Sequence, residues 1–186
     1  MPIGGKSRAL DARVQPVLIW PRRPRSASAG PRAAGGLVAG NVLLEATVRD
    51  RAELFELIGG HLQAGDGVDP ADVIAALAYR ERIGSTALGH GVAIPHARLK
   101  GIDGIRRMYL RLAAPIAFDA PDGAPVSDVY ALLVPKRAEQ EHLAALAEVS
   151  GCLIDPGFRK ALHRCASAED VVHLFAAWPA AHAVRT

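Results

Sequence analysis

The spacing of hydrophobic residues predicts two helices early in the patterned part of the chain. Apolar residues recur every three or four positions over 51–63 and again over 70–82, as they do on one face of a helix. Residues 42–48 precede them as a short strand or an extended entry. Capping residues stand before both helices: Asp50 with Glu53, and Asp69 with Pro70.

Strand-like apolar runs occupy the middle of the chain. A short run around Val92 is followed by 105–112 and 129–134, and the turn-rich segment 119–125 predicts the connection between the last two. Three helical segments close the chain: 138–153, 156–164 and 168–178, the last capped by Ser167 with Asp170. Helices, then strands, then helices predict one mixed sheet with helices covering its faces.

The first 36 residues lack any sustained period and contain five prolines and five glycines. Such a segment cannot bury enough apolar surface to offset the entropy lost on ordering, so we expect residues 1–36 to be a disordered basic extension. Its role stays open between an interaction arm, a transit segment and no role at all. A single domain is expected over 37–180, with a short tail at 181–186.

Charge is distributed unevenly along the chain, whose formal net charge is +3. Residues 1–36 carry seven basic residues and one acidic residue, and the rest carries 15 basic and 18 acidic residues. The folded part is therefore mildly acidic, and we expect it not to bind nucleic acid. No apolar run approaches the 18 residues that span a bilayer, so we expect a cytoplasmic protein without membrane insertion. Cys152 and Cys165 lack CxxC spacing, which fits a reducing compartment.

One histidine stands in a stretch suited to chemistry, Gly89-His90-Gly91-Val92-Ala93-Ile94-Pro95-His96. The proline restricts its own backbone and that of the residue before it. Gly89 and Gly91 allow the backbone to approach a ligand closely. His96 is thus held at a strand's end, where a neutral imidazole could act as a nucleophile or a ligand. The simpler interpretation is that it terminates the strand and bonds a nearby carbonyl.

Two more residues are candidates for the same site. His142 falls in the first turns of a predicted helix, where free N–H groups and the helix dipole favour an anion. Arg80 lies at the end of the second predicted helix. Taken alone, each is more typical of a solvated surface residue.

Taken together, these segments resemble the type-2 IIA family of the bacterial phosphoenolpyruvate-dependent phosphotransferase system. The strings that carry the resemblance are Arg80–Thr86 and Gly89–His96. Three others are similar to its nitrogen-regulatory branch: Pro115–Asp119, Ala131–Pro135 and His142–Leu146. The resemblance covers about residues 40–178 and departs from the family pattern at His90, Ala97 and Gly151.

The resemblance implies a three-layer α/β/α sandwich with a mixed sheet, and it implies roles for the candidate residues. His96 would be the phosphoryl acceptor, His142 would stabilise the phosphoryl group, and Arg80 would supply a nearby cation. Backbone N–H groups around Gly89 and Gly91 could add to the phosphate-binding potential. The second nitrogen of His96 needs a fixed acceptor, for which a backbone carbonyl is the simplest candidate.

The implied function is that of a relay protein, not an autonomous turnover enzyme. It would accept a phosphoryl group from a phosphocarrier protein, without cofactor or metal, and regulate nitrogen metabolism by binding regulatory protein targets according to its phosphorylation state. The alternative is a sugar-specific IIA component, of the fructose or mannitol type, that passes the phosphoryl group to a IIB domain. Apolar candidates for the docking face are Ile83, Leu88 and Ile94, although residues of this kind more often belong to the core.

Other classes of function fit the sequence less well. A zinc site would need His90, His96 and His142, but the spacing of the first two is not a recognised ligand pair. Neither cysteine has an evident base nearby in the sequence. An interaction module that has lost phosphorylation would not need the pair His96 and His142, which this sequence contains.

Overall fold

The computed structural model describes residues 36–62, 68–137 and 139–182. The expected disorder of residues 1–36 concerns a segment that, except for Gly36, lies outside the described residues. No helix in the described ranges is long and apolar enough to cross a membrane.

The elements follow the predicted order of helices, strands and helices. They are a 3-10 turn η1 (Ala39–Asn41), β1 (Val42–Ala46), α1 (Arg51–Leu62), α2 (Pro70–Ile83), β2 (Ala87–Gly89), β3 (Val92–Ala93), β4 (His96–Leu99), β5 (Arg106–Ile116), β6 (Val126–Pro135), α3 (Glu139–Ile154), α4 (Pro156–Leu162) and α5 (Ala168–His182).

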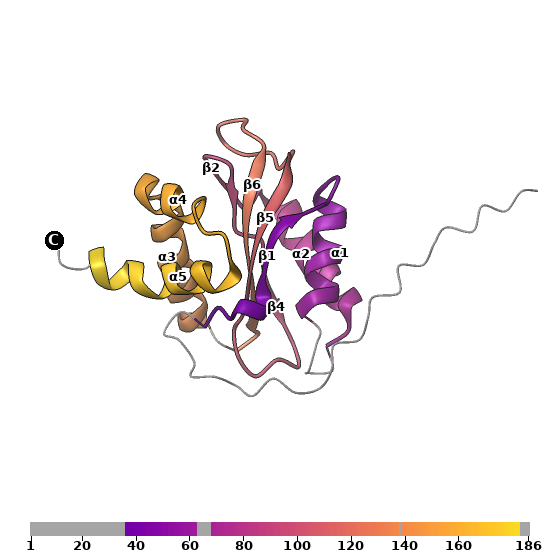
Figure 1. Cartoon of the computed structure of the whole chain (residues 1–186). Coiled ribbons are helices and arrows are strands. Elements are labelled where there is room, and N and C mark those ends of the chain that lie inside the picture. The colour runs from indigo at the N-terminus through magenta and orange to yellow at the C-terminus, as the bar shows by residue number, and fades with distance from the viewer. Residues whose placement is uncertain (1–35, 63–67, 138, 183–186) are drawn as a thin grey trace, which may run out of the picture. The chain divides into compact units, whose positions relative to one another are not determined.

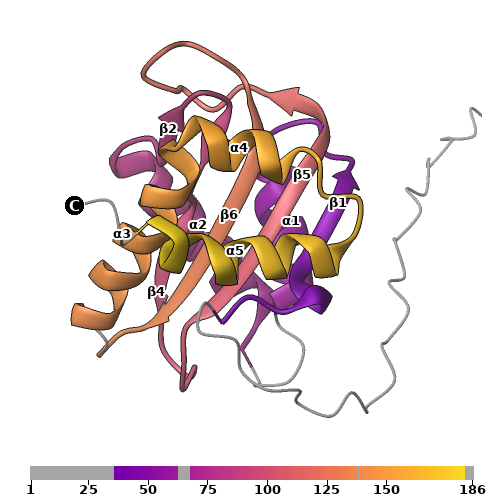
Figure 2. The same cartoon turned by 60° about the vertical axis from the view of Figure 1, so that its left-hand side comes forward.

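The strands form one mixed sheet in the order β1-β5-β6-β3-β2, with β4 also paired to β6. β5 and β6 are antiparallel and joined by the turn predicted at 119–125, whereas β1 runs parallel to β5, and β3 and β4 run parallel to β6. β3 and β4 therefore lie on the same side of β6, one after the other along its length. β6 is thus the strand that positions β4, which lies beside it in Figure 2.

Helices cover both faces of the sheet, with α1 and α2 on one side and α3, α4 and α5 on the other (Figure 1). Alternate residues of β6 enter the two cores: Val129, Ala131 and Leu133 face α1 and α2, while Tyr130 and Leu132 face the other helices. A strand covered on both faces has no polar side, which explains its unbroken apolar run. The predicted three-layer α/β/α sandwich is confirmed.

Polar side chains cap the helices where the sequence predicts them. Asp50 Oδ1 accepts from the Glu53 N–H at 3.0 Å, and Asp69 Oδ1 accepts from the Ala71 N–H at 2.9 Å. The same kind of bond starts α5, where Ser167 Oγ accepts from the Asp170 N–H. These bonds satisfy N–H groups that the helix leaves without internal partners.

Several elements differ in length from the prediction. β5 and β6 extend beyond the apolar runs because their pairing continues to Ile116 and Val126. β1 ends at Ala46, after an irregularity where Glu45 has φ of 60°. α5 continues to His182, so the boundary expected at 180 falls inside this helix. Cross-strand and helix–sheet contacts set these ends, and they leave little trace in local spacing.

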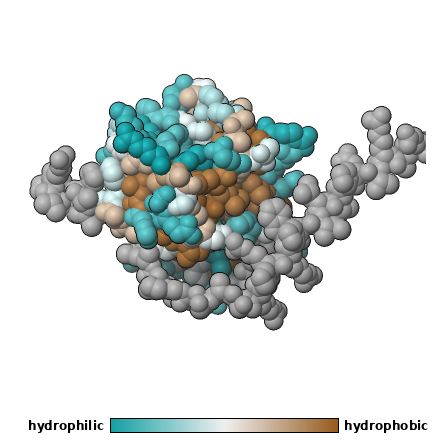
Figure 3. Space-filling model, viewed as in Figure 1, coloured by the Kyte–Doolittle hydropathy of each residue, from teal (hydrophilic) through white to brown (hydrophobic). Residues whose placement is uncertain are grey.

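Among the strands that the structure describes, β1 lies at one edge of the sheet and pairs with β5. Its Leu43 and Leu44 are only partly buried, and Val38 just before it is exposed. In the space-filling view a hydrophobic band crosses this face of the molecule over β1 and the adjoining helix surfaces (Figure 3).

A buried carboxylate ties the centre of the sheet to the helices of the second layer. Asp128 on β6 accepts hydrogen bonds from the Tyr109 hydroxyl at 2.5 Å and from Ser127 Oγ at 3.1 Å, and it pairs with His163 Nε2 at 2.8 Å. Burial and the neighbouring Asp128 raise the pKa of Tyr109, so its hydroxyl remains a donor. Arg111 adds contacts to the Leu162 and Cys165 carbonyls.

This network predicts a specific loss of stability. Tyr109→Phe removes the shortest bond to a buried carboxylate and should lower the free energy of unfolding by about 1.5–3 kcal/mol. Tyr79→Phe removes the same hydroxyl from an exposed side chain and should change it by less than about 0.5 kcal/mol. Denaturant unfolding of both variants measures the difference, and equal effects would contradict the assigned role of Asp128.

Candidate functional site

His96 is the first residue of β4 and is half-buried at one end of the sheet. It lies opposite Leu132 of β6, whose N–H donates to the Pro95 carbonyl at 3.0 Å. Ala97 and Leu99 point into the core under α1 and α2, so the alternation along β4 turns His96 to the other face. The strand thus holds the imidazole by its backbone and leaves one side of the ring accessible.

The two ring nitrogens of His96 have different partners. Nδ1 lies 2.8 Å from the Ile94 carbonyl oxygen, which can only accept, so Nδ1 carries the proton. Arg80 Nε donates to Nε2 at 3.1 Å, and an arginine N–H can only donate, so Nε2 presents a lone pair. The geometry selects one neutral tautomer, and the Ile94 carbonyl is the kind of acceptor that the sequence suggested.

The environment of His96 also favours its uncharged state. Burial lowers the pKa of His96 below its ordinary value of 6.5, and the positive charge of Arg80 lowers it further. The hydrogen bond to Ile94 and the negative charge of Glu81 act in the opposite direction without cancelling the shift. At neutral pH the ring is therefore uncharged, which is the state in which an imidazole can act as a nucleophile.

Arg80 reaches the site from the last turn of α2. Its Nη1 donates to the Gly84 carbonyl at 2.8 Å, just after the helix ends, which directs the rest of the guanidinium toward His96. Positive charge at a helix C-terminus is favourable, so the local structure supports a cation at this position.

His142 lies on α3 and is buried beside His96. The two ring centroids are 5.4 Å apart, and the planes are tilted by 59°. Arg98 Nε donates to His142 Nδ1 at 3.4 Å. Residues of α2, β4 and α3, distant in sequence, thus converge on one point, and the structure brings together all three side chains proposed from the sequence.

Three neighbours of the site were not predicted as site residues. Glu81 and Thr86 bond one another behind His96, and Arg98 contacts His142. Glu81 and Thr86 belong to the string Arg80–Thr86, but their spacing in the sequence did not indicate that their side chains form a hydrogen bond. Arg98 could have been predicted, because a residue two positions after His96 on the same strand faces the same side of the sheet.

Gly89 and Gly91 do not join this site. They turn the hairpin between β2 and β3 with φ values of 85° and 77°, a conformation that favours glycine, and His90 lies between them. The register pairs Val92 with Asp128 and His96 with Leu132, and these partners are about 13 Å apart along β6 at the usual rise of a strand. The expected phosphate-binding role of the two glycines has no geometric support. The tight turn of the hairpin is enough to explain why glycine stands at both positions.

The apolar residues named as docking candidates separate in the structure. Ile83 at the end of α2 is exposed, whereas Ile94 is buried in the core and Leu88 is partly buried against it. The predicted docking role is therefore wrong for Ile94. Tyr79 and Leu143, which adjoin Arg80 and His142 in the chain, are exposed.

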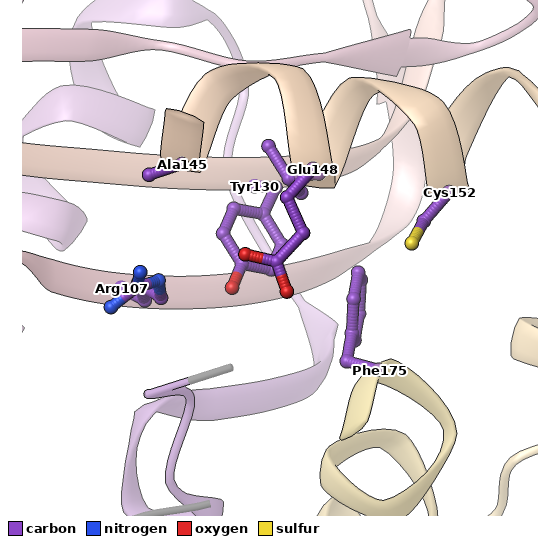
Figure 4. Close-up of a pocket in the computed structure, with 7 residues that line it drawn as sticks. Arg107, Tyr130, Ala145, Glu148, Cys152 and Phe175 are labelled. Carbon is purple, nitrogen blue, oxygen red and sulfur yellow. The ribbon is translucent and has the colours of Figure 1, made fainter. Parts of the chain in front are cut away.

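The alternative chemistries find little support. The described residues contain no group of three or more His, Cys, Asp or Glu arranged to hold a metal ion, and His90 is removed from His96 by the hairpin. Figure 4 shows Cys152 in a separate pocket beside Tyr130, Glu148 and Phe175. Burial raises the pKa of Cys152 to about 11, so it remains a thiol at neutral pH.

The lowered pKa of His96 predicts its titration. Its imidazole should protonate with a midpoint below 6.5, and Arg80→Met should move that midpoint upward because a nearby positive charge is lost. Between 6.5 and the lowered midpoint, the unfolded chain binds a proton that the folded chain does not, so stability should fall as pH falls through this range. Proton NMR of the ring Cε1–H measures the midpoint, and a value above 6.5 would contradict the assigned environment.

Comparison with known proteins finds related chains over the folded part of this sequence. Residues 37–178 match the family described as "Phosphoenolpyruvate-dependent sugar phosphotransferase system, EIIA 2". The chain is 34% identical to a nitrogen regulatory protein of Bradyrhizobium diazoefficiens over 77% of its own length and 95% of the relative's. It is 42% identical to one from Pseudomonas aeruginosa, over 54% of this chain and 66% of that protein.

A solved structure gives the same result. The nitrogen regulatory protein IIA-Ntr of Neisseria meningitidis superposes with a TM-score of 0.72 and 38% identity, covering 74% of this chain and 94% of that one. The resemblance drawn from the sequence motifs, including the nitrogen-regulatory branch, is confirmed. With His96, Arg80 and His142 gathered in the matched region, the chain belongs to the type-2 IIA family of the phosphotransferase system.

Proposed function

We propose that this protein accepts a phosphoryl group on Nε2 of His96 and acts in nitrogen regulation through its phosphorylation state. The observation that carries the proposal is the tautomer: Nδ1 is bonded to the Ile94 carbonyl, and Nε2 presents its lone pair beside a guanidinium. A neutral, oriented imidazole next to fixed positive charge is what an in-line phosphoryl transfer requires.

The transfer balances without a metal or cofactor. The lone pair of His96 Nε2 attacks the phosphorus of a phosphohistidine on the donor, and a new N–P bond forms. The donor's N–P bond breaks, and its electron pair returns to the donor's imidazole. The proton on His96 Nδ1 stays in place, held by Ile94. The protein's own contribution is positioning and electrostatic stabilisation.

Arg80 and His142 stabilise the phosphoryl group in this proposal. Arg80 Nε occupies the lone pair of Nε2 in the unphosphorylated protein, so it gives up this bond and faces the incoming phosphoryl oxygens. His142, whose ring centroid is 5.4 Å from that of His96, lies within reach of the same group. The negative charge spread over three oxygens would be stabilised by both side chains.

The donor in this proposal is the phosphocarrier protein of the phosphotransferase system. Transient transfer needs a small face that binds and releases. The exposed apolar residues Tyr79, Ile83 and Leu143 adjoin the site in the chain and form the candidate docking face. Tyr79 and Ile83 share the last turns of α2 with Arg80, so docking would bring the donor directly over the guanidinium.

Regulation follows from the charge that phosphorylation adds. A phosphoryl group brings about −1.5 to −2 charges to a surface where Arg80 and Arg98 now stand, and such a change alters which partners bind. The nitrogen regulatory names of the relatives favour this output over the sugar-specific alternative. The regulatory protein targets and a cytoplasmic location stay predictions.

The acceptor assignment is tested by labelling. Incubation with radiolabelled phosphoenolpyruvate, the first enzyme of the system and the phosphocarrier should label the wild-type protein but not His96→Ala. His142→Ala should still accept the label, about a hundredfold more slowly, because one stabilising group is lost. His173→Ala, an exposed histidine on α5, is the matched control and should label normally. Full labelling of His96→Ala would refute the assignment.

The labelled protein also separates the two outputs. In the regulatory role the label should return to the phosphocarrier and not pass onward. Transfer from His96 to a fructose- or mannitol-type IIB domain would favour the sugar-specific alternative.

The docking face predicts a selective kinetic effect. Ile83 is 67% exposed beside the site, and Ile83→Glu should raise the KM for the phosphocarrier by about five- to tenfold with little change in kcat, because it disturbs binding and not chemistry. Ile154→Glu is the control, since Ile154 is 54% exposed at the far end of α3. Steady-state transfer at varied phosphocarrier concentration measures both, and equal KM values for the two variants would contradict this docking face.

A further inference from the structure

Glu81 is a buried carboxylate in an unfavourable place. Its side chain is only 7% exposed, and it lies in the last turn of α2, where the helix dipole disfavours negative charge. Burying a carboxylate is costly unless hydrogen bonds compensate for lost water. Two unfavourable effects therefore act on the same side chain, and strong local bonds must offset them.

The hydrogen bonds that the Glu81 carboxylate accepts come from Thr86. The Thr86 hydroxyl donates to Glu81 Oε2 at 2.6 Å, and the Thr86 N–H lies 3.1 and 3.2 Å from the two carboxylate oxygens. Arg51 Nη1 is 3.8 Å from the same carboxylate, a looser contact. Both donors of one buried residue are thus held by one carboxylate, which fixes the Thr86 peptide in position and orientation.

Thr86 in turn holds the segment that orients His96. Its carbonyl accepts from the Ile94 N–H at 3.0 Å, and the Ile94 carbonyl accepts the Nδ1 proton of His96 at 2.8 Å. Pro95 has no N–H to offer, and its carbonyl is held by the Leu132 N–H. The Ile94 carbonyl is therefore held from one side by Thr86 and from the other by β6.

We propose that Glu81 is a positioning residue, which acts through Thr86 to keep the Ile94 carbonyl aimed at Nδ1 of His96 and so keeps the Nε2 lone pair available. The inference rests on the proposed function for its catalytic consequence, but its structural content is the tautomer of one ring. Glu81 does not bond the ring, so its effect on transfer is indirect. The accompanying negative charge also supports the basicity of His96 against burial and Arg80.

A purely structural role for Glu81, as a clamp on the loop after α2, makes a different prediction. In that case its loss lowers stability but leaves His96 in one tautomer. Long-range proton–nitrogen correlation spectra of the histidine rings separate the two roles, because they report which nitrogen carries the proton and need no phosphoryl donor.

The test compares the full-length wild type with Glu81→Gln, Thr86→Val and Thr86→Ser. In the wild type, Nδ1 of His96 should be protonated and Nε2 should not. Glu81→Gln and Thr86→Val should show a mixture of tautomers and transfer about ten- to a hundredfold slower, because the nucleophile is less often oriented. Thr86→Ser keeps the hydroxyl and should behave as the wild type. The matched control is Glu56→Gln, which alters an exposed carboxylate on α1.

An unchanged tautomer in both Glu81→Gln and Thr86→Val would overturn the inference, whatever their rates. If Glu81→Gln does not fold, the contrast between Thr86→Val and Thr86→Ser carries the same decision. Absence of label on wild-type His96 would refute the proposed function instead, and the ring spectra would still decide the role of Glu81.

Discussion

The hydrogen bond from His96 Nδ1 to the Ile94 carbonyl is the contact on which the proposed phosphoryl transfer depends. It places the proton on one nitrogen and leaves the other with a lone pair, facing Arg80. A flexible carbonyl could not do this, because an unconstrained imidazole exchanges between tautomers. The carbonyl is rigid because a proline follows it and because the flanking peptides are bonded to β6 and to Thr86. In the proposed function, the sheet therefore influences the transfer through the position of one backbone oxygen.

The charged groups around this bond shift the pKa of His96 in opposite directions. Arg80 and burial keep the ring neutral, while Glu81 limits how far its basicity falls. Arg98 lies beside His142 on the α3 side of β4, so the positive charges of Arg80 and Arg98 both lie near the position where the proposal places the phosphoryl group. The carboxylate of Glu81, whose side chain is only 7% exposed, accepts hydrogen bonds from Thr86. In the proposed function, positive charge faces the phosphoryl group and negative charge lies on the Nδ1 side of His96, an arrangement that suits reversible transfer of a dianion.

Local patterns predicted the elements well and their limits less well. The caps at Asp50, Asp69 and Ser167 were predicted correctly because a capping bond involves residues close in sequence. The ends of β5 and β6 were missed, because pairing between strands continues after the apolar run stops. The glycines of the β2–β3 hairpin were assigned to the site from their nearness to His96 in sequence. Only the register along β6 places them away from it.

By itself the sequence determined the order of elements, the apolar run that became β6 and the identity of His96, His142 and Arg80 as partners in one family pattern. These properties depend on hydrophobic spacing and on motifs, which a linear chain displays directly. The tertiary structure alone decided which carbonyl selects the His96 tautomer, that Glu81 and Thr86 lie behind it, and that Ile94 is core while Ile83 is exposed. Such facts require distances between segments far apart in the chain, and only packing sets those distances.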